Sequence, residues 1–171
     1  MKKIAVFGKS GGGKSTFSKE LSSLTGIPLL PLDLIEYLEG GEKVSEEQYL
    51  QKYNDVLNAD TWIIEGFGTM ETFQERLKAA DTLIYIDLPM WVHYWRVTKR
   101  FLLSPFVKPV GWPDSSPMLR STYNCYIHLY KVAPKFWNSK FLRRLEGMSK
   151  EKNVVHLSST KALDQFLDEL R

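Results

Sequence analysis

Cysteine is nearly absent from this chain, which carries one, Cys125, in 171 residues. One thiol can neither form an internal disulfide nor complete a zinc site, so the composition is not that of a disulfide-stabilised secreted module. Long apolar runs are also missing. None approaches the roughly 18 residues needed to cross a bilayer, and the run Ile4–Phe7 is too short for the core of a secretory signal. We therefore expect a cytoplasmic protein with no membrane partner.

Internal repeats and low-complexity linkers are missing as well, which argues against several domains joined by flexible segments. A length of 171 residues is close to the common size of one domain and allows a core that needs no metal or disulfide. We expect a single domain over residues 1–171, with a core made of residues 1–104 and 150–171. Residues from about 105 to 149 are expected to form an insertion.

Acidic residues are scarce in one part of the chain only. Residues 90–145 hold ten Lys or Arg and one acid, Asp114, a balance of +9, whereas the rest of the chain has a balance of −6 and the whole chain +3. The same segment contains twelve of the 22 aromatic residues. A basic, aromatic segment within an otherwise acidic protein suggests an anionic partner or substrate.

Five short apolar runs alternate with stretches of helical periodicity. The runs are apolar throughout, which is typical of parallel strands covered on both faces. We predict strands at residues 3–7, 27–32, 61–65, 82–88 and 153–157. The fold class is therefore α/β, with a five-stranded parallel sheet between two layers of helices. Within the insertion, the pattern predicts helices over 117–131 and 135–145, separated by Pro134.

The first predicted strand leads into a glycine-rich loop, Gly8–Ser15, which matches G-x-x-x-x-G-K-[ST] between a strand and a helix. This motif makes the fold that of a P-loop NTPase. Glycines let successive backbone N–H groups point at one phosphate, and the next helix adds its positive N-terminal end. Lys14 can reach the β- and γ-phosphates of ATP, and the Ser15 hydroxyl can bind Mg²⁺. The residues expected to bind the nucleotide are Gly8, Ser10, Gly11, Gly12, Gly13, Lys14, Ser15 and Thr16.

Acids follow the predicted strands, at the sheet edge where ligands bind in such folds. Asp33 and Glu65 can each hold Mg²⁺ beside the phosphate loop, or accept a proton from a substrate hydroxyl. We assign the metal to Ser15 and Glu65, and contact with the phosphoryl acceptor to Asp33. The alternatives are an ordinary loop acid for Glu65 and a helix N-cap for Asp33. For Asp87 we expect the N-cap of the following helix.

These motifs resemble those of the adenylate-kinase-like P-loop kinases, most closely the subgroup of topology modulation, or FlaR-type, proteins. The resemblance covers about residues 1–104, where Arg76, Tyr85–Pro89 and the basic positions of the next helix are among the matching positions, and it covers the remainder only in layout. Members of the subgroup commonly have Asp-Gly after the third strand and then Asn-Tyr, where this chain has Glu65–Gly68 as Glu-Gly-Phe-Gly. The resemblance implies binding of ATP and Mg²⁺ and a mobile helical lid, and it leaves the acceptor open.

Basic residues on the helix after the fourth strand complete the expected catalytic set. Arg96, Lys99 and Arg100 share one side of that helix, and in the resembling kinases arginines of this region close over the transferring phosphoryl group. The catalytic residues expected are therefore Lys14, Asp33, Arg96 and Arg100. The alternative for each arginine is a solvated surface charge. The insertion is expected to be a lid or core packing, with nucleic-acid contact and self-association as alternatives.

We expect an ATP-dependent kinase that transfers the γ-phosphoryl group of Mg-ATP to a small acceptor, such as a nucleoside, a nucleotide or another hydroxyl compound. The alternative is a nucleotide-dependent regulatory or nucleic-acid-associated ATPase with no small-molecule acceptor. Release of ADP that requires an acceptor distinguishes the two. The oligomeric state is left open by the sequence.

Overall fold

The computed structural model describes residues 1–38, 42–106 and 118–171, so the first part of the expected insertion, residues 105–117, lies almost wholly outside it. The sheet has five strands: β1 (Lys3–Gly8), β2 (Leu29–Pro31), β3 (Trp62–Glu65), β4 (Thr82–Ile86) and β5 (Asn153–Leu157). They pair in the order β2-β3-β1-β4-β5, and every pairing is parallel. The predicted α/β fold with a five-stranded parallel sheet is therefore confirmed.

Helices connect the strands, and several begin or end at residues that favour helix termini. They are α1 (Lys14–Thr25), α2 (Leu32–Glu36), α3 (Glu46–Leu57), α4 (Met70–Ala79), α5 (Met90–Leu103), α6 (Met118–Ile127), the π-helix η1 (His128–Val132), α7 (Ala133–Phe136), α8 (Ser139–Met148) and α9 (Thr160–Asp168). Helix α1 ends at Gly26, which has a φ of 71°. Ser45 and Ser159 cap α3 and α9 by accepting bonds from backbone N–H groups.

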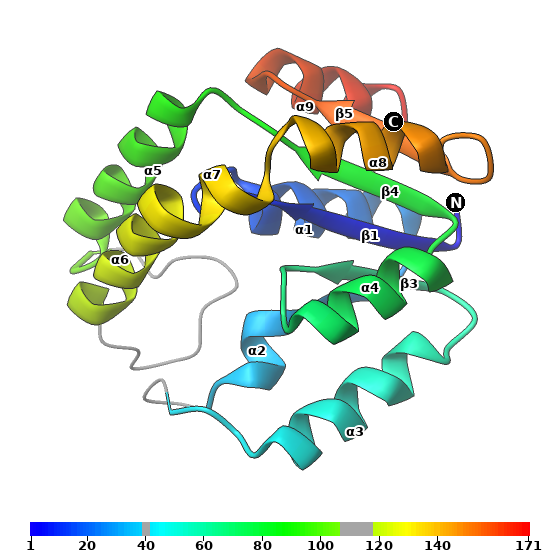
Figure 1. The fold of residues 1–171 in the computed structure, drawn as a ribbon, viewed down its shortest axis with the longest axis horizontal. Coiled ribbons are helices and arrows are strands. Elements are labelled where there is room, and N and C mark those ends of the chain that lie inside the picture. Colours follow the sequence, from blue (N-terminus) through cyan, green and yellow to red (C-terminus); the bar gives the residue numbers. More distant parts are fainter. Residues whose placement is uncertain (39–41, 107–117) are drawn as a thin grey trace.

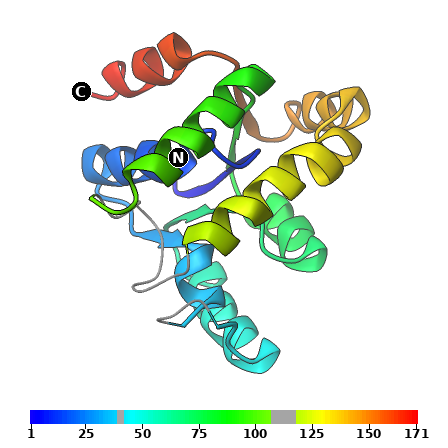
Figure 2. The ribbon, with the colours of Figure 1, turned by 90° about the vertical axis from the view of Figure 1, so that its left-hand side faces the viewer.

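The strands send alternate side chains into two apolar layers. Ala5 and Phe7 of β1 belong to one core cluster and Ile4 and Val6 to the other, and all four are fully buried. Figure 2 shows the two layers, with α1 and α9 on one side of the sheet and α4 and α8 on the other. Because both faces are covered, each strand reads as a continuous apolar run in the sequence.

Aromatic side chains fill the layer between the sheet and helices α7 and α8, which cross its front in Figure 1. The Trp137 ring stacks on Phe7 and Tyr85 with ring centroids 6.0 and 5.3 Å apart, and Phe141 packs edge-on against Trp137 at 4.9 Å. The second half of the segment that the sequence assigns to an insertion therefore supplies side chains to the core of the sheet.

The break in this helical segment falls at Asn138, so the prediction of a break at Pro134 is wrong. Pro134 lies in the first turn of α7, directly after the π-helix η1. A widened turn accommodates the missing N–H and the bulky ring, and the chain remains helical through the proline. Asn138 instead starts α8, because its side chain accepts bonds from the backbone N–H groups of Lys140 and Phe141 at 3.0 and 3.2 Å.

Helices α5 and α6 lie together beside the strand ends, on the left in Figure 1. The rings of Tyr94 and Tyr126 stack with centroids 6.0 Å apart, and the Tyr126 hydroxyl also bonds the Thr98 hydroxyl. Arg100 Nη2 contacts Cys125 Sγ at 3.1 Å. Within the part of the chain that the structure describes, none of the helices combines the length and apolarity needed to cross a bilayer.

Candidate nucleotide and acceptor site

The phosphate loop joins β1 to α1 and has the backbone shape of an anion-binding nest. Gly11 and Gly13 have φ values of 76° and 84°, a region that glycine adopts at low cost. A Cβ on Gly11 would lie 2.7 Å from the backbone oxygen of His93, and a Cβ on Gly13 would lie 2.7 Å from Arg96 Nη1. The loop therefore needs glycine both for its dihedral angles and for the close approach of α5.

The charged and polar side chains at the start of α1 reach toward the strand ends. Lys14 Nζ donates to the backbone oxygen of Lys9 at 3.1 Å. The Ser15 hydroxyl donates to Glu65 Oε2 at 3.1 Å. Thr16 is exposed in the first turn of the helix. The loop thus presents a lysine, a hydroxyl and several backbone amides at one end of the sheet, the set that a triphosphate requires.

Two carboxylates stand at the ends of neighbouring strands beside the loop. Glu65 closes β3 and is 5% exposed, so it is not a loop acid at the surface. Asp33 lies in the first turn of α2, whose N-cap is Pro31, so Asp33 does not cap that helix. The Asp33 side chain is exposed to solvent on one side. Protein atoms packed around the carboxyl group displace part of its hydration water and raise the pKa of Asp33 to about 6. The charge of Glu65 adds to this effect, and the charge of Lys14 opposes it.

Ser15 and Glu65 fit a magnesium ion. A hydroxyl and a carboxylate are oxygen donors of the kind that Mg²⁺ prefers, and Mg²⁺ usually takes its other ligands from water and substrate phosphates. Their oxygens are 3.1 Å apart, so both can contact a single ion after a small shift. The donor set and the glycine nest together suit a magnesium–triphosphate complex.

The two predicted catalytic arginines project from α5 toward different parts of the site. Arg96 Nη1 donates to the backbone oxygen of Gly12 at 2.8 Å, which brings its guanidinium against the phosphate loop. Arg100 contacts Cys125, and its positive charge lowers the pKa of Asp33, against the partial loss of hydration that raises it. Arg96 therefore lies against the phosphate loop, and Arg100 acts electrostatically on Asp33.

The other basic side chains of α5, α6 and α8 do not contact the phosphate loop or Asp33 in the described structure. Lys99 and Arg120 are exposed on α5 and α6. Arg143 and Arg144 are exposed on α8, and Arg144 bonds the Gln74 side chain of α4, on the opposite face of the sheet from α1. Among the described residues, Arg96 and Arg100 are thus the arginines that the fold brings to the phosphate loop and to Asp33.

The prediction that Asp87 forms the N-cap of the following helix is wrong. Asp87 does not cap the next helix, because α5 begins at Met90 and Pro89 occupies the cap position. Instead it forms an ion pair with Lys9, a largely buried lysine of the phosphate loop, and its other oxygen lies 3.3 Å from His156 Nε2. The charge of Lys9 and these bonds keep the pKa of Asp87 low despite partial burial, which by itself would raise it.

Two histidines lie near the phosphate loop although no sequence motif marks them. His93 is fully buried and touches the phosphate loop with its ring. His128 begins the π-helix η1, and burial together with the charge of Lys14 lowers its pKa. Their spacing in sequence carries no metal-binding pattern. The signal that could have found His93 is its position three residues before Arg96, on the helix face that packs on the loop.

A cavity of about 310 Å³ opens beside the phosphate loop, between α1 and α9. Its lining is mixed, with apolar side chains from both helices beside the charged groups of Glu20, Asp164 and Arg96. Its lining residues are Gly13, Thr16, Phe17, Glu20, Arg96, Thr160, Leu163, Asp164 and Leu167.

Comparison with known proteins gives the class of fold. No family model and no curated protein matches the chain. The chain is similar to shikimate kinase from Acinetobacter baumannii in complex with shikimate, with a TM-score of 0.58 and 17% identity, covering 99% of this chain and 90% of that one. It is also similar to a candidate kinase from Chloroflexus aurantiacus J-10-fl, with a TM-score of 0.55, 16% identity, and coverage of 98% and 95%.

These likenesses extend over nearly the whole of each chain, so the fold is that of the P-loop kinases. At such low identity the likeness concerns the fold alone. Membership of the FlaR-type subgroup stays a prediction.

Proposed function

We propose that this protein is an ATP-dependent kinase that transfers the γ-phosphoryl group of Mg-ATP to a hydroxyl group of a small molecule. The observation that carries the proposal is the hydrogen bond from Ser15 to Glu65, close enough to Asp33 that the charges of Glu65 and Lys14 shift the pKa of Asp33. The side chains that would bind the phosphates, the metal ion and the acceptor then lie at the same edge of the sheet. The likeness in fold to two kinases supports the same function.

The nucleotide would be held by the phosphate loop and α1. Lys14 at present bonds a neutral carbonyl, which it would exchange for the more strongly bonding oxygens of a triphosphate. Ser15 and Glu65 would hold Mg²⁺, which neutralises phosphate charge when bound. The cavity between α1 and α9 has room for the nucleoside, and Thr16 at its rim can donate to a phosphate.

Asp33 is the residue we assign to the acceptor. A carboxylate with a pKa near 6 accepts a proton more readily than an ordinary aspartate does. In the proposed reaction the acceptor oxygen bonds to the γ-phosphorus, the bond to the β–γ bridging oxygen breaks, and the hydroxyl proton passes to Asp33. ADP leaves with the bridging oxygen. A nucleoside, a nucleotide or another small hydroxyl compound would suit this site.

Arg96 and Arg100 would neutralise the charge that spreads over the transferring phosphoryl group. Arg96 lies against the loop, where the phosphates would bind. Arg100 exerts its charge on Asp33, on the acceptor side. Together the two arginines would flank the position at which the γ-phosphoryl group is transferred from ATP to the acceptor.

The test is release of ADP from Mg-ATP in the presence of a panel of nucleosides, nucleoside monophosphates and hydroxy acids. We expect release that depends on one class of acceptor. The variant Asp33→Asn should lose that release while it still binds ATP. Release that is equally fast with and without every acceptor would overturn the proposal.

One observation favours a second candidate, a nucleic-acid-associated ATPase. Trp91 and Trp95 are 71% and 59% exposed on one side of α5, and the described residues from 90 to 145 carry no acidic side chain. Exposed indoles beside basic groups can stack on unpaired bases. This candidate predicts hydrolysis of ATP that needs no acceptor and is accelerated by a single-stranded oligonucleotide.

A further inference from the structure

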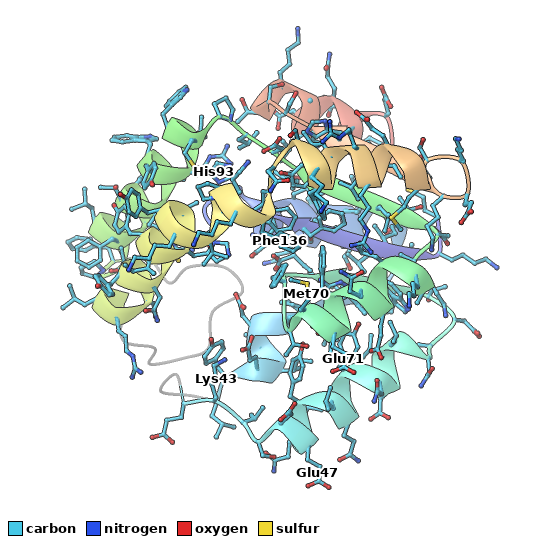
Figure 3. All side chains as sticks on the ribbon, viewed as in Figure 1. Lys43, Glu47, Met70, Glu71, His93 and Phe136 are labelled. Atoms are coloured by element: carbon cyan, nitrogen blue, oxygen red, sulfur yellow. The ribbon has the colours of Figure 1, made fainter. Side chains whose placement is uncertain are left out.

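His93 is buried between the phosphate loop and the end of β4. Its side chain comes from the first turn of α5 and is 0% exposed. In Figure 3 it lies on the side of α5 that faces the loop. Ring atom Nδ1 is 2.8 Å from the backbone oxygen of Ser10, and Nε2 is 3.1 Å from the backbone oxygen of Leu88.

Both neighbours of this ring are hydrogen-bond acceptors, but a neutral imidazole has one N–H to donate. The ring is neutral near pH 7, because burial and the charges of Lys9 and Lys14 lower the pKa of His93 to about 4, against the raising effect of the two carbonyl oxygens. The contact with Ser10 is the shorter of the two. We therefore assign the proton to Nδ1 and the hydrogen bond to the Ser10 carbonyl.

A bond to the Ser10 carbonyl also fixes the amide that follows it. The C=O of one residue and the N–H of the next lie in one plane and point in opposite directions. If His93 holds the Ser10 oxygen toward α5, the Gly11 N–H must point away from α5. Arg96 acts in the same way on the peptide between Gly12 and Gly13, since it donates to the Gly12 oxygen at 2.8 Å.

The packing leaves this part of the loop little room to adopt another orientation. A Cβ on Gly11 would lie 2.7 Å from the His93 backbone oxygen and 2.9 Å from Val97 Cγ2, and a Cβ on Gly12 would lie 3.2 Å from His93 Cε1. Helix α5 thus forms a wall along one side of the loop. The amides that face away from this wall are those available to an anion.

We propose that His93 is a positioning residue of the phosphate loop: its Nδ1–H holds the Ser10 carbonyl and thereby aims the Gly11 amide at the phosphates of the bound nucleotide. The inference rests on nucleotide binding, which is part of the proposed function, and needs neither an acceptor nor turnover. It can therefore fail while the kinase reaction stands, and it can hold if no acceptor is found.

Two variants of nearly equal shape separate positioning from packing. Asparagine and leucine have similar size and branching, but only asparagine carries a donor where His93 has Nδ1. Both lose the contact with Leu88. We expect His93→Leu to bind Mg-ATP roughly tenfold more weakly than the wild type, the change typical of one lost hydrogen bond, and His93→Asn to bind within about threefold of it.

Calorimetric titration with Mg-ATP measures these affinities, with thermal unfolding of each variant as the check on folding. Equal affinity of His93→Leu and the wild type would overturn the proposal. So would equal weakening in the two variants, because a role in packing alone predicts no rescue by asparagine.

A spectroscopic measurement on the wild type keeps the proposal falsifiable if either variant fails to fold. Long-range proton–nitrogen correlation on protein labelled with ¹⁵N-histidine reports which ring nitrogen is protonated. The nucleotide-free protein should show His93 neutral with the proton on Nδ1. A proton on Nε2 would mean that the ring serves the Leu88 carbonyl and would overturn the proposal.

Discussion

The Ser15 hydroxyl donates a hydrogen bond to Glu65 Oε2 across 3.1 Å, although 50 residues separate the two in sequence. The parallel pairing of β1 with β3 produces this contact, because its register sets Val6 opposite Glu65 and so ends both strands at the same edge. The first residues of α1 then lie beside the end of β3. A hydroxyl suited to Mg²⁺ and a buried carboxylate meet where the phosphates would bind.

Removal of the Lys14 ammonium should abolish most ATP affinity. We expect Lys14→Ala to bind Mg-ATP at least tenfold more weakly, because a hydrogen bond from a charged donor to phosphate contributes about 1.5–3 kcal/mol. Isothermal titration calorimetry measures the change. Lys19→Ala is the matched control, since Lys19 is exposed on the same helix. Unchanged binding by Lys14→Ala would show that the loop does not hold the triphosphate.

Loss of the Glu65 charge should change the magnesium requirement. Glu65→Gln keeps the shape and a hydrogen-bond acceptor for Ser15, but it loses the negative charge that attracts the cation. We expect the Mg²⁺ concentration for half-maximal turnover to rise about tenfold in this variant. For Glu65→Asp, which keeps the charge, we expect a concentration between those of Glu65→Gln and the wild type.

The control for this experiment is Glu47→Gln, since Glu47 lies on α3, far from the loop in Figure 3. A magnesium titration of turnover provides the measurement. If Glu65→Gln and Glu47→Gln gave the same curve, Glu65 would have no part in metal binding.

Asp33→Asn should reduce turnover without reducing ATP affinity. An amide cannot accept the acceptor's proton, and loss of a general base typically costs about 100-fold or more in kcat. Asp55→Asn, at an exposed position of α3, is the matched control. Initial rates at saturating acceptor give kcat, and calorimetry gives the ATP affinity. Wild-type kcat in Asp33→Asn would remove Asp33 from the reaction.

Burial of His93 predicts how stability depends on pH. Its pKa is lowered from 6.5 to about 4 in the folded protein, whereas the unfolded chain keeps the ordinary value. Between these two pH values the unfolded chain binds more protons, so the free energy of unfolding falls as the pH drops through this range and is unaffected by His93 above it. The full effect is on the order of 3 kcal/mol.

Urea unfolding at several pH values, on wild type and His93→Asn, measures this contribution. Asparagine does not titrate, so the variant should lose the part of the slope that His93 causes. Asp33, whose pKa is raised, contributes a slope of opposite sign to both proteins and cancels in the comparison. Identical slopes in the two proteins would contradict the burial of a neutral His93.

Most of the sheet and the phosphate loop could be predicted from the sequence, because they depend on local patterns. The apolar runs mark buried strands, and the loop Gly8–Ser15 needs its residue types at fixed positions. The positions of Asp33 and Glu65 followed from the rule that parallel strands end at one edge. Each of these features is decided by neighbours in sequence or by one simple topological rule.

The features that were missed depend on contacts between distant segments. The pairing of Asp87 with Lys9 requires β1 and β4 to be neighbours, and an N-cap was the simpler local interpretation. Trp137 completes the core from a segment that composition marks as basic and separate. His93 gains its role from the approach of α5 to the loop. The periodicity of apolar residues and the helix or strand propensities of a sequence do not report contacts between such distant segments.

The most direct test of the central claim is to follow the terminal phosphate of ATP. Protein, Mg²⁺ and ATP labelled with ³²P at the γ-position are incubated with the acceptor panel, and the products are separated by thin-layer chromatography. The proposed function predicts label in one organic acceptor, with Asp33→Asn unable to form that product. Label found only in inorganic phosphate, at a rate that oligonucleotides raise and acceptors do not, would contradict it.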